Sequence, residues 1–163
     1  MKKIDVPLLI SCLLITQFAG IIGSVFTVKA ITSWYRFLIK PFLNPPSWLF
    51  GPVWTLLFLL MGISLYLAIR QTHTLFFKDD KIFYFGLIFF GLQWVLNILW
   101  SYLFFYLHSP LWGLIDIILL AIFIALTIYY FWRLRPVAAY LLIPYLAWVL
   151  FATYLNYSLW RFN

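Results

Sequence analysis

Charged side chains are scarce in this chain of 163 residues, and their scarcity indicates its class. Only 9% of the residues are charged and 66% are hydrophobic, and the mean hydropathy is +1.03. Soluble domains carry about 25% charged residues, and a short chain leaves much of its surface in water. Because no soluble core of this size could absorb so much apolar surface, the composition predicts an integral membrane protein.

Cysteine and acidic residues are also rare. Cys12 is the only cysteine, which excludes an intrachain disulfide and a multi-cysteine metal site. The chain holds 11 Lys and Arg against 4 Asp and Glu, a formal charge of +7. These basic residues fall between the apolar runs and form no stripe with base-reading residues. We therefore expect no nucleic-acid partner, no metal site and no required cofactor.

Five apolar runs are long enough to cross a bilayer, which takes about 20 residues. None alternates like a barrel strand, so the predicted fold class is an all-α integral membrane protein, a bundle of five transmembrane helices. The runs cover residues 6–28, 48–69, 82–107, 111–132 and 137–160. The first run is too long for the apolar core of a signal peptide and is expected to be retained. Short links favour antiparallel neighbours, so residues 1–163 are expected to form one domain.

Prolines and basic residues characterise the links. The longest link contains KPFLNPPSW at 40–48, whose three prolines forbid a continuous helix. Pro52 and Pro144 lie inside predicted helices, where each favours a kink. The N-terminus and the second and fourth links carry seven Lys and Arg, and the opposite side carries four. This bias predicts a cytoplasmic N-terminus, and we expect the cell (inner) membrane.

Nine tryptophans need an explanation in so apolar a chain. Five occupy positions typical of the aromatic belt at a membrane interface, where an apolar ring and a polar N–H are both satisfied. These five are Trp34, Trp48, Trp112, Trp132 and Trp160. Trp94, Trp100 and Trp148 lie several residues deeper, and Trp54 is borderline. The interfacial belt does not explain the deep tryptophans.

Helical spacing of about 100° per residue places the deep tryptophans on three aromatic faces. The faces are Phe50, Trp54, Phe58 and Met61; Gln93, Trp94, Asn97, Trp100, Ser101 and Phe104; and Tyr145, Trp148, Ala152 and Asn156. Polar side chains in spans generally face the bundle interior. Three such faces would suit a flat, largely apolar ligand. Alternatively, the faces pack against one another, with the amides as interhelical hydrogen bonds.

Three stretches resemble the TspO/MBR family, the tryptophan-rich sensory proteins related to the mitochondrial translocator protein (peripheral benzodiazepine receptor). They are WYRFLIKPFLNPPSWLFGPVWTLLF at 34–58, LNILWSYLFF at 96–105 and PYLAWVLFATYLN at 144–156. The resemblance implies a five-helix homodimer that binds porphyrins (protoporphyrin IX or haem) and isoquinoline- or benzodiazepine-type ligands under the first long link. Residue by residue, it implies a pocket formed by Tyr35, Trp54, Phe58, Asn97, Trp100, Ser101, Trp148 and Ala152.

The resemblance implies a sensory, regulatory or porphyrin-handling role. Two alternatives stay open, because both would use the same pocket. One is a transporter of porphyrins or related compounds. The other is light-dependent breakdown of protoporphyrin IX, for which the resemblance implicates Trp54 and Trp148 as photochemical residues. That photochemistry needs no general acid, base or metal, so a dedicated enzyme is not predicted.

Other features have competing interpretations. His73 and His108 lie in links on opposite membrane sides, so a paired-histidine haem site within the bundle is not expected. Asp116 is the only acid inside a span; it is either functional or structural, reaching interfacial water or a nearby base. LNYSLWR at 155–161 fits a loose cholesterol pattern, in which Arg161 is equally an interfacial anchor.

Small residues on the first span form another feature of this kind. Ala19, Gly20, Gly23 and Ser24 make a face that allows another helix to approach closely. The sequence does not identify the surface through which a homodimer would form.

Overall fold

The structure, a computed structural model, describes residues 4–72 and 80–163. Within these ranges the chain forms helices and connecting turns without a strand. Five helical segments are long and apolar enough to span a membrane: Val6–Thr32, Ser47–Arg70, Lys81–Tyr106, Pro110–Leu134 and Pro136–Phe162. The predicted all-α bundle of five membrane-spanning segments is confirmed, and their ends differ from the predicted ends by a few residues.

Two of the helices begin with the same local device. α1 (Val6–Thr32) follows Asp5, whose carboxylate accepts a hydrogen bond from the Leu8 N–H at 3.1 Å. α4 (Pro110–Leu134) follows Ser109, whose hydroxyl accepts from the Trp112 N–H at 3.4 Å. Each cap satisfies a backbone donor that the first helical turn leaves without a partner. A proline in the first turn completes both starts, because its missing N–H is not needed there.

Pro52 lies at the start of its helix. A 3₁₀ turn, η2 (Ser47–Leu49), leads directly into α2 (Phe50–Thr72), and Pro52 lies in the first turn of α2. No hydrogen bond inside α2 is lost at that position. Pro52 lies inside a helix as expected, but a proline in the first turn gives no reason for the expected kink.

The last span is interrupted in its first half. α5 (Pro136–Tyr140) ends before Leu141 and Leu142, and α6 (Ile143–Phe162) begins just before Pro144. Pro144 has no N–H to donate to the preceding turn. The kink predicted at this proline is present as a full break between two helices.

The third span changes its helical pitch next to the long link. α3 (Asp80–Ser101) continues into η3 (Tyr102–Tyr106), a π-helical turn. A π turn contains an extra residue, which shifts the faces of the residues that follow it. The neighbours Phe104 and Phe105 are consequently both buried, at 2% and 5% exposure.

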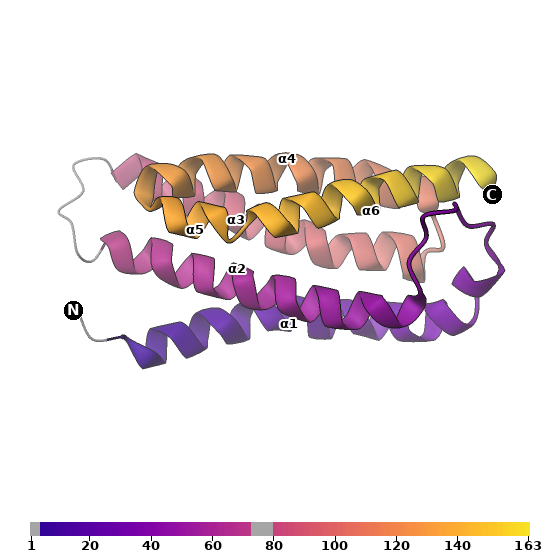
Figure 1. Cartoon of the computed structure of the whole chain (residues 1–163), viewed down its shortest axis with the longest axis horizontal. Coiled ribbons are helices and arrows are strands. Elements are labelled where there is room, and N and C mark those ends of the chain that lie inside the picture. The colour runs from indigo at the N-terminus through magenta and orange to yellow at the C-terminus, as the bar shows by residue number, and fades with distance from the viewer. Residues whose placement is uncertain (1–3, 73–79) are drawn as a thin grey trace.

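The helices run along one common direction (Figure 1). α1 packs against α2 and α3, α4 packs against α3 and α6, and α5 contacts α2 and α4. The link from α1 to α2, which includes η1 (Tyr35–Phe37), lies at the same end as Asn163 (Figure 1). The Ile39 N–H donates to Asn163 Oδ1 at 2.9 Å, and Asn163 Nδ2 donates to the Ile39 carbonyl at 3.2 Å. These two bonds hold the link over that end of the bundle.

The opposite half of the bundle is closely packed. Met61, Ile124 and Phe131 have no exposed surface there. A Cβ added at Gly62 would lie 2.9 Å from the Cα of Leu13, so the two backbones approach too closely for a larger residue. The half of the bundle under the long link is packed less completely.

Candidate ligand-binding site

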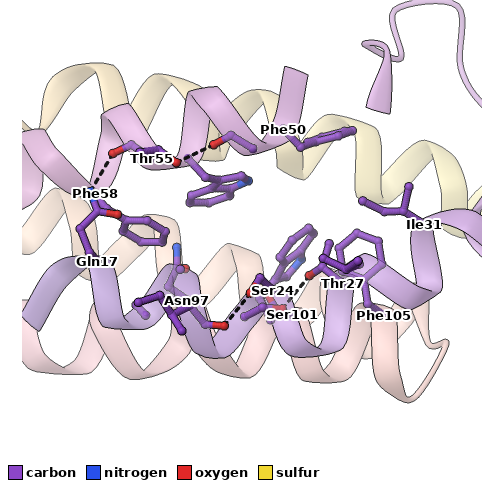
Figure 2. Close-up of a pocket in the computed structure, with 18 of the residues that line it drawn as sticks. Gln17, Ser24, Thr27, Ile31, Phe50, Thr55, Phe58, Asn97, Ser101 and Phe105 are labelled. Atoms are coloured by element: carbon purple, nitrogen blue, oxygen red, sulfur yellow. Dashed lines mark hydrogen bonds between the residues drawn. The ribbon is translucent and has the colours of Figure 1, made fainter. Parts of the chain in front are cut away.

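A cavity of about 350 Å³ lies between α1, α2 and α3, in the half of the bundle under the long link (Figure 2). Its lining includes Gln17, Gly20, Gly23, Ser24, Thr27 and Ile31 from α1, Phe50, Trp54, Thr55 and Phe58 from α2, and Asn97, Trp100, Ser101 and Phe105 from the third span. Ser24, Gly51 and Thr55 are exposed on the outer surface. The cavity therefore opens along the seam between α1 and the first turns of α2.

The two glycines of α1 let the walls of this cavity come together. A Cβ at Gly20 would lie 2.8 Å from Cε2 of Phe58, and a Cβ at Gly23 would lie 2.9 Å from Oγ of Ser101. Two members of the small-residue face, Gly20 and Gly23, are thus in close contact with other helices of the chain. Ser24, on the same face, is exposed.

Aromatic rings from two helices form the main wall. Trp54 stacks on Phe58 with ring centroids 5.5 Å apart and an interplanar angle of 28°. The Trp100 ring lies 6.5 Å from Trp54 and is tilted by 32°. Rings in offset or tilted arrangements present π faces to a third ring. The wall can therefore stack a flat aromatic ligand.

A few polar groups lie at the edges of the cavity. Asn97 is 5% exposed, and its Nδ2 donates to the Tyr145 hydroxyl at 2.9 Å, which fixes the orientation of the amide. Gln17 Nε2 donates to the Thr55 carbonyl at 3.0 Å and bridges the seam between α1 and α2 (Figure 2). The mixture of aromatic walls and a few fixed polar groups is typical of small-molecule pockets.

A second cavity, of about 30 Å³, lies directly under the long link. Its lining is Tyr35, Phe50, Trp100, Phe104, Phe105, Ala152, Leu155, Asn156 and Leu159. Tyr35 is 3% exposed and its hydroxyl donates to Asn44 Oδ1 at 2.8 Å. Burial raises the pKa of the Tyr35 hydroxyl above its ordinary value, and the bond to Asn44 acts in the opposite direction. The long link thus contributes a buried tyrosine to the interior.

The eight pocket residues implied by the resemblance fall into three groups. Five of them line the larger cavity: Trp54, Phe58, Asn97, Trp100 and Ser101. Tyr35 and Ala152 line the smaller cavity together with Trp100. Trp148 lines neither cavity and packs behind Phe50, with ring centroids 6.3 Å apart. The structure therefore brings five of the eight together around the larger cavity. The other three lie beyond Phe50 and Trp100, outside that cavity.

The contribution of α1 was missed, although the sequence contains its signal. Lining residues recur along α1 at positions 17, 20, 24, 27 and 31, with alternating steps of three and four. This spacing marks one face of a helix, and Gln17 and Thr27 are polar members of it within an apolar span. We interpreted its small residues as a packing face for another helix, and not as a cavity wall.

Asp116 lies in the interior of the bundle, on α4. Its side chain is 4% exposed, and no donor among the described residues reaches its Oδ2. The functional and the structural interpretation of Asp116 therefore both stay predictions. Gln93 is also fully buried, and neither polar atom of its amide has a partner in the described part of the chain. Neither residue lines the two cavities.

The remaining candidates lie outside the cavities. His73 lies outside the described residues, and His108 is exposed in a turn, 4.8 Å from the Trp34 ring. Leu155 faces the smaller cavity, whereas Tyr157 is 49% exposed. The cholesterol-like pattern therefore does not form a single surface.

The fold and the cavity define an integral, multi-pass membrane protein with an aromatic pocket between its first three spans. The sequence profile described as the TspO/MBR family matches residues 12–161. The chain therefore belongs to the TspO/MBR family, and the resemblance seen in its motifs is confirmed.

Three relatives show how far the similarity extends. The chain is 44% identical over 155 residues to tryptophan-rich protein TspO of Archaeoglobus fulgidus, covering 95% of this chain and 96% of the relative. It is 43% identical over 152 residues to tryptophan-rich protein TspO of Chlorobaculum tepidum, with 93% of each chain covered. It is 37% identical over 142 residues to the human translocator protein, covering 87% of this chain and 82% of the relative. The similarity therefore extends over nearly the whole fold.

Proposed function

We propose that this protein binds tetrapyrroles and similar flat hydrophobic ligands, in a sensory, regulatory or porphyrin-handling role. The larger cavity carries the proposal. Its wall of Trp54, Phe58 and Trp100 offers π faces inside a membrane-spanning bundle, and Asn97 and Ser101 add polar groups at its edge. Apolar stacking supplies most of the affinity in such a site, and the polar groups fix the orientation of the ligand.

The volume of the cavity limits how each ligand would bind. Small-molecule pockets usually measure roughly 300–1,000 Å³, so a cavity of about 350 Å³ is near the lower limit. An isoquinoline- or benzodiazepine-type ligand would be enclosed. Protoporphyrin IX or haem would insert one edge against Trp54 and leave its propionates at the exposed seam beside Thr55. Haem would be held by stacking and shape, since no histidine or cysteine lines the cavity among the described residues.

The position of the cavity supports binding more strongly than transport. Its lining comes from one half of the bundle, from residues 17–31, 47–58 and 97–105. The other half is filled by side chains such as Met61, Ile124 and Phe131, which have no exposed surface. A carrier would have to open that packed half to move a ligand across. A stable binding site needs no such rearrangement.

Light-dependent breakdown of protoporphyrin IX is a second candidate, favoured by one observation. Trp54 is part of the cavity wall, so its indole would contact a bound porphyrin. An excited porphyrin stacked on an indole could exchange an electron with it or generate reactive oxygen beside it. In this proposal the breakdown is a consequence of binding.

We also propose that the N-terminus is cytoplasmic and that the membrane is the cell membrane. Seven Lys and Arg flank that side and four flank the other, which is the usual bias of cytoplasmic links. The cavity would then open in the outer half of the bilayer. A homodimer is proposed from the family resemblance.

Titration of protoporphyrin IX into purified protein in the dark tests the proposal. Saturable quenching of tryptophan emission is expected in the wild type. Ser101→Leu fills the cavity and should weaken binding at least about tenfold, the effect of 1.4 kcal/mol. Trp112→Phe, at an exposed belt position, is the matched control and should bind like the wild type. Linear quenching, or equal affinity in both variants, would reject the site.

Two further measurements separate the alternatives on the same protein. A transporter gives saturable porphyrin flux in sealed vesicles, and Ser101→Leu should abolish that flux. A photocatalyst destroys many porphyrins per protein under illumination in detergent. A binder gives affinity with neither activity.

A further inference from the structure

The two cavities are separated by a thin wall of side chains. Phe50, Trp100 and Phe105 line both cavities, so the same three rings are exposed to each. No other residue is shared by the two linings. Displacing one of these rings would therefore join the cavities.

Trp100 is the member of the wall with a specific polar anchor. Its Nε1 donates to Asn156 Oδ1 at 3.0 Å, and Asn156 Nδ2 donates in turn to the Pro110 carbonyl at 2.6 Å. Asn156 is 2% exposed, so water does not compete for these bonds. The Trp100 ring also stacks on Phe104 at 5.2 Å and 14°. The hydrogen bonds and this stack together hold the ring across the space between the cavities.

The far side of the wall has an unused donor. Trp148 packs on Phe50, and its Nε1 is buried without an acceptor among the described residues. Buried polar groups in native proteins nearly always have a partner. Trp148 lines neither cavity, so a ligand would reach this N–H only if Phe50 moved aside as well. Tyr35 and Ala152 line the space that a ligand passing the wall would enter.

We propose that Trp100, held by Asn156, is a partition that determines which ligands the site accepts. With the partition in place, the ligand is confined to the larger cavity. With Trp100 displaced, the cavities join, and a longer ligand reaches the small cavity under the link. This inference rests on the proposed function of the larger cavity, and it assigns to one tryptophan the upper limit on ligand size.

A chemical probe of the small cavity tests the partition without any ligand. Cys12→Ser removes the native thiol, and Ala152→Cys then places a single thiol in the small cavity. Its reaction with methyl methanethiosulfonate should be at least about tenfold faster when Trp100→Ala is added, because the thiol otherwise reacts only during local opening. Asn156→Leu should give a smaller acceleration, since it removes the anchor and leaves the ring.

Trp94→Ala is the matched control for this probe. Trp94 is on the same helix and donates to the Ile15 carbonyl at 3.0 Å, and it lines neither cavity. Its loss should leave the rate at position 152 unchanged. Trp100→Phe serves as a second variant in case Trp100→Ala does not fold, and it should accelerate the reaction by removing the indole N–H.

Ligand binding provides the second readout. Trp100→Phe should raise the affinity for protoporphyrin IX relative to that for isoquinoline, because only the larger ligand gains the second space. If no variant binds porphyrin while the thiol reacts faster without Trp100, the proposed function fails and the partition stands. If the wild type binds porphyrin and the thiol rate is the same with and without Trp100, the partition is refuted and the function stands.

Discussion

Gly20 is the position where a single methyl group should affect both stability and binding. Its Cβ would lie 2.8 Å and 2.9 Å from two carbons of the Phe58 ring, well inside ordinary contact distance. Phe58 is 3% exposed and stacks on Trp54, so the space left for its ring is the cavity that it lines. We expect Gly20→Ala to push this ring toward the cavity and to narrow it.

The magnitude follows from two opposing effects. Overpacking a well-packed core costs about 1–3 kcal/mol, and replacing a helical glycine by alanine returns roughly 0.5–1 kcal/mol. Gly91 in α3 is the matched control, because nothing lies within 4 Å of the Cβ added there. Gly91→Ala should gain the stability of replacing a helical glycine without any overpacking. The two variants should therefore differ in unfolding free energy by about 1–3 kcal/mol, with Gly20→Ala the less stable.

Thermal or denaturant unfolding in detergent measures this difference, and a porphyrin titration of the same samples measures the loss of affinity. Gly20→Ala should bind protoporphyrin IX at least about tenfold more weakly than Gly91→Ala, which corresponds to 1.4 kcal/mol. Equal stability and equal affinity of the two variants would show that α1 does not contact Phe58 as described. A loss of stability without a loss of affinity would show that this wall does not touch the ligand.

Three further predictions concern residues in and around the cavities. Trp54→Phe should slow light-dependent loss of porphyrin absorbance more than Trp148→Phe, since only Trp54 lines the larger cavity; equal slowing would contradict this. Asp116→Asn should unfold at the same or a higher temperature, with a gain of up to about 1 kcal/mol, because a buried carboxyl oxygen such as Oδ2, which has no donor among the described residues, is costly; a marked loss would reveal a stabilising bond. Tyr35 should lose its contribution to stability in alkali: burial raises its folded-state pKa, so this contribution is complete below the usual pKa of about 10 and disappears as pH rises through the folded-state value. Tyr35→Phe should therefore lose less stability than the wild type above pH 10 in unfolding measurements, and parallel curves would refute the assignment.

The spans were predictable because the membrane imposes a length and an apolar composition that a sequence displays directly. The interruption before Pro144 was predictable as a kink for the same local reason, a missing N–H. That Pro52 falls in the first turn of α2 was not predictable, because a helix start depends on where the preceding chain turns, here through η2 at 47–49. The π turn at Tyr102–Tyr106 left no recognised signal, since its sequence is aromatic like its surroundings.

The cavity was less predictable than the helices. Periodicity brought Trp54, Asn97 and Trp100 to interior faces, but it could not show which interior faces meet and which leave a space. That outcome depends on the crossing of α1 over α2 and α3, which Gly20 and Gly23 permit through close contacts. Small residues on α1 predict that another helix approaches it closely. They do not predict that a cavity remains beside these close contacts.

The deep tryptophans were interpreted either as the lining of a ligand pocket or as packing between helices, and each interpretation describes different residues. Trp94 donates to the Ile15 carbonyl of α1 and serves helix packing. Trp54 and Trp100 line the larger cavity, and the Trp100 N–H also donates a hydrogen bond to Asn156. Trp148 lines neither cavity, and its N–H has no acceptor in the part of the chain that the structure describes. These tryptophans differ in whether the ring is packed and the N–H is hydrogen-bonded by other residues of the chain. A tryptophan whose ring is packed and whose N–H is bonded within the chain has no free group for a ligand. We therefore expect substitutions of Trp54, Trp100 and Trp148 to alter ligand recognition. Substitution of Trp94 should alter stability alone.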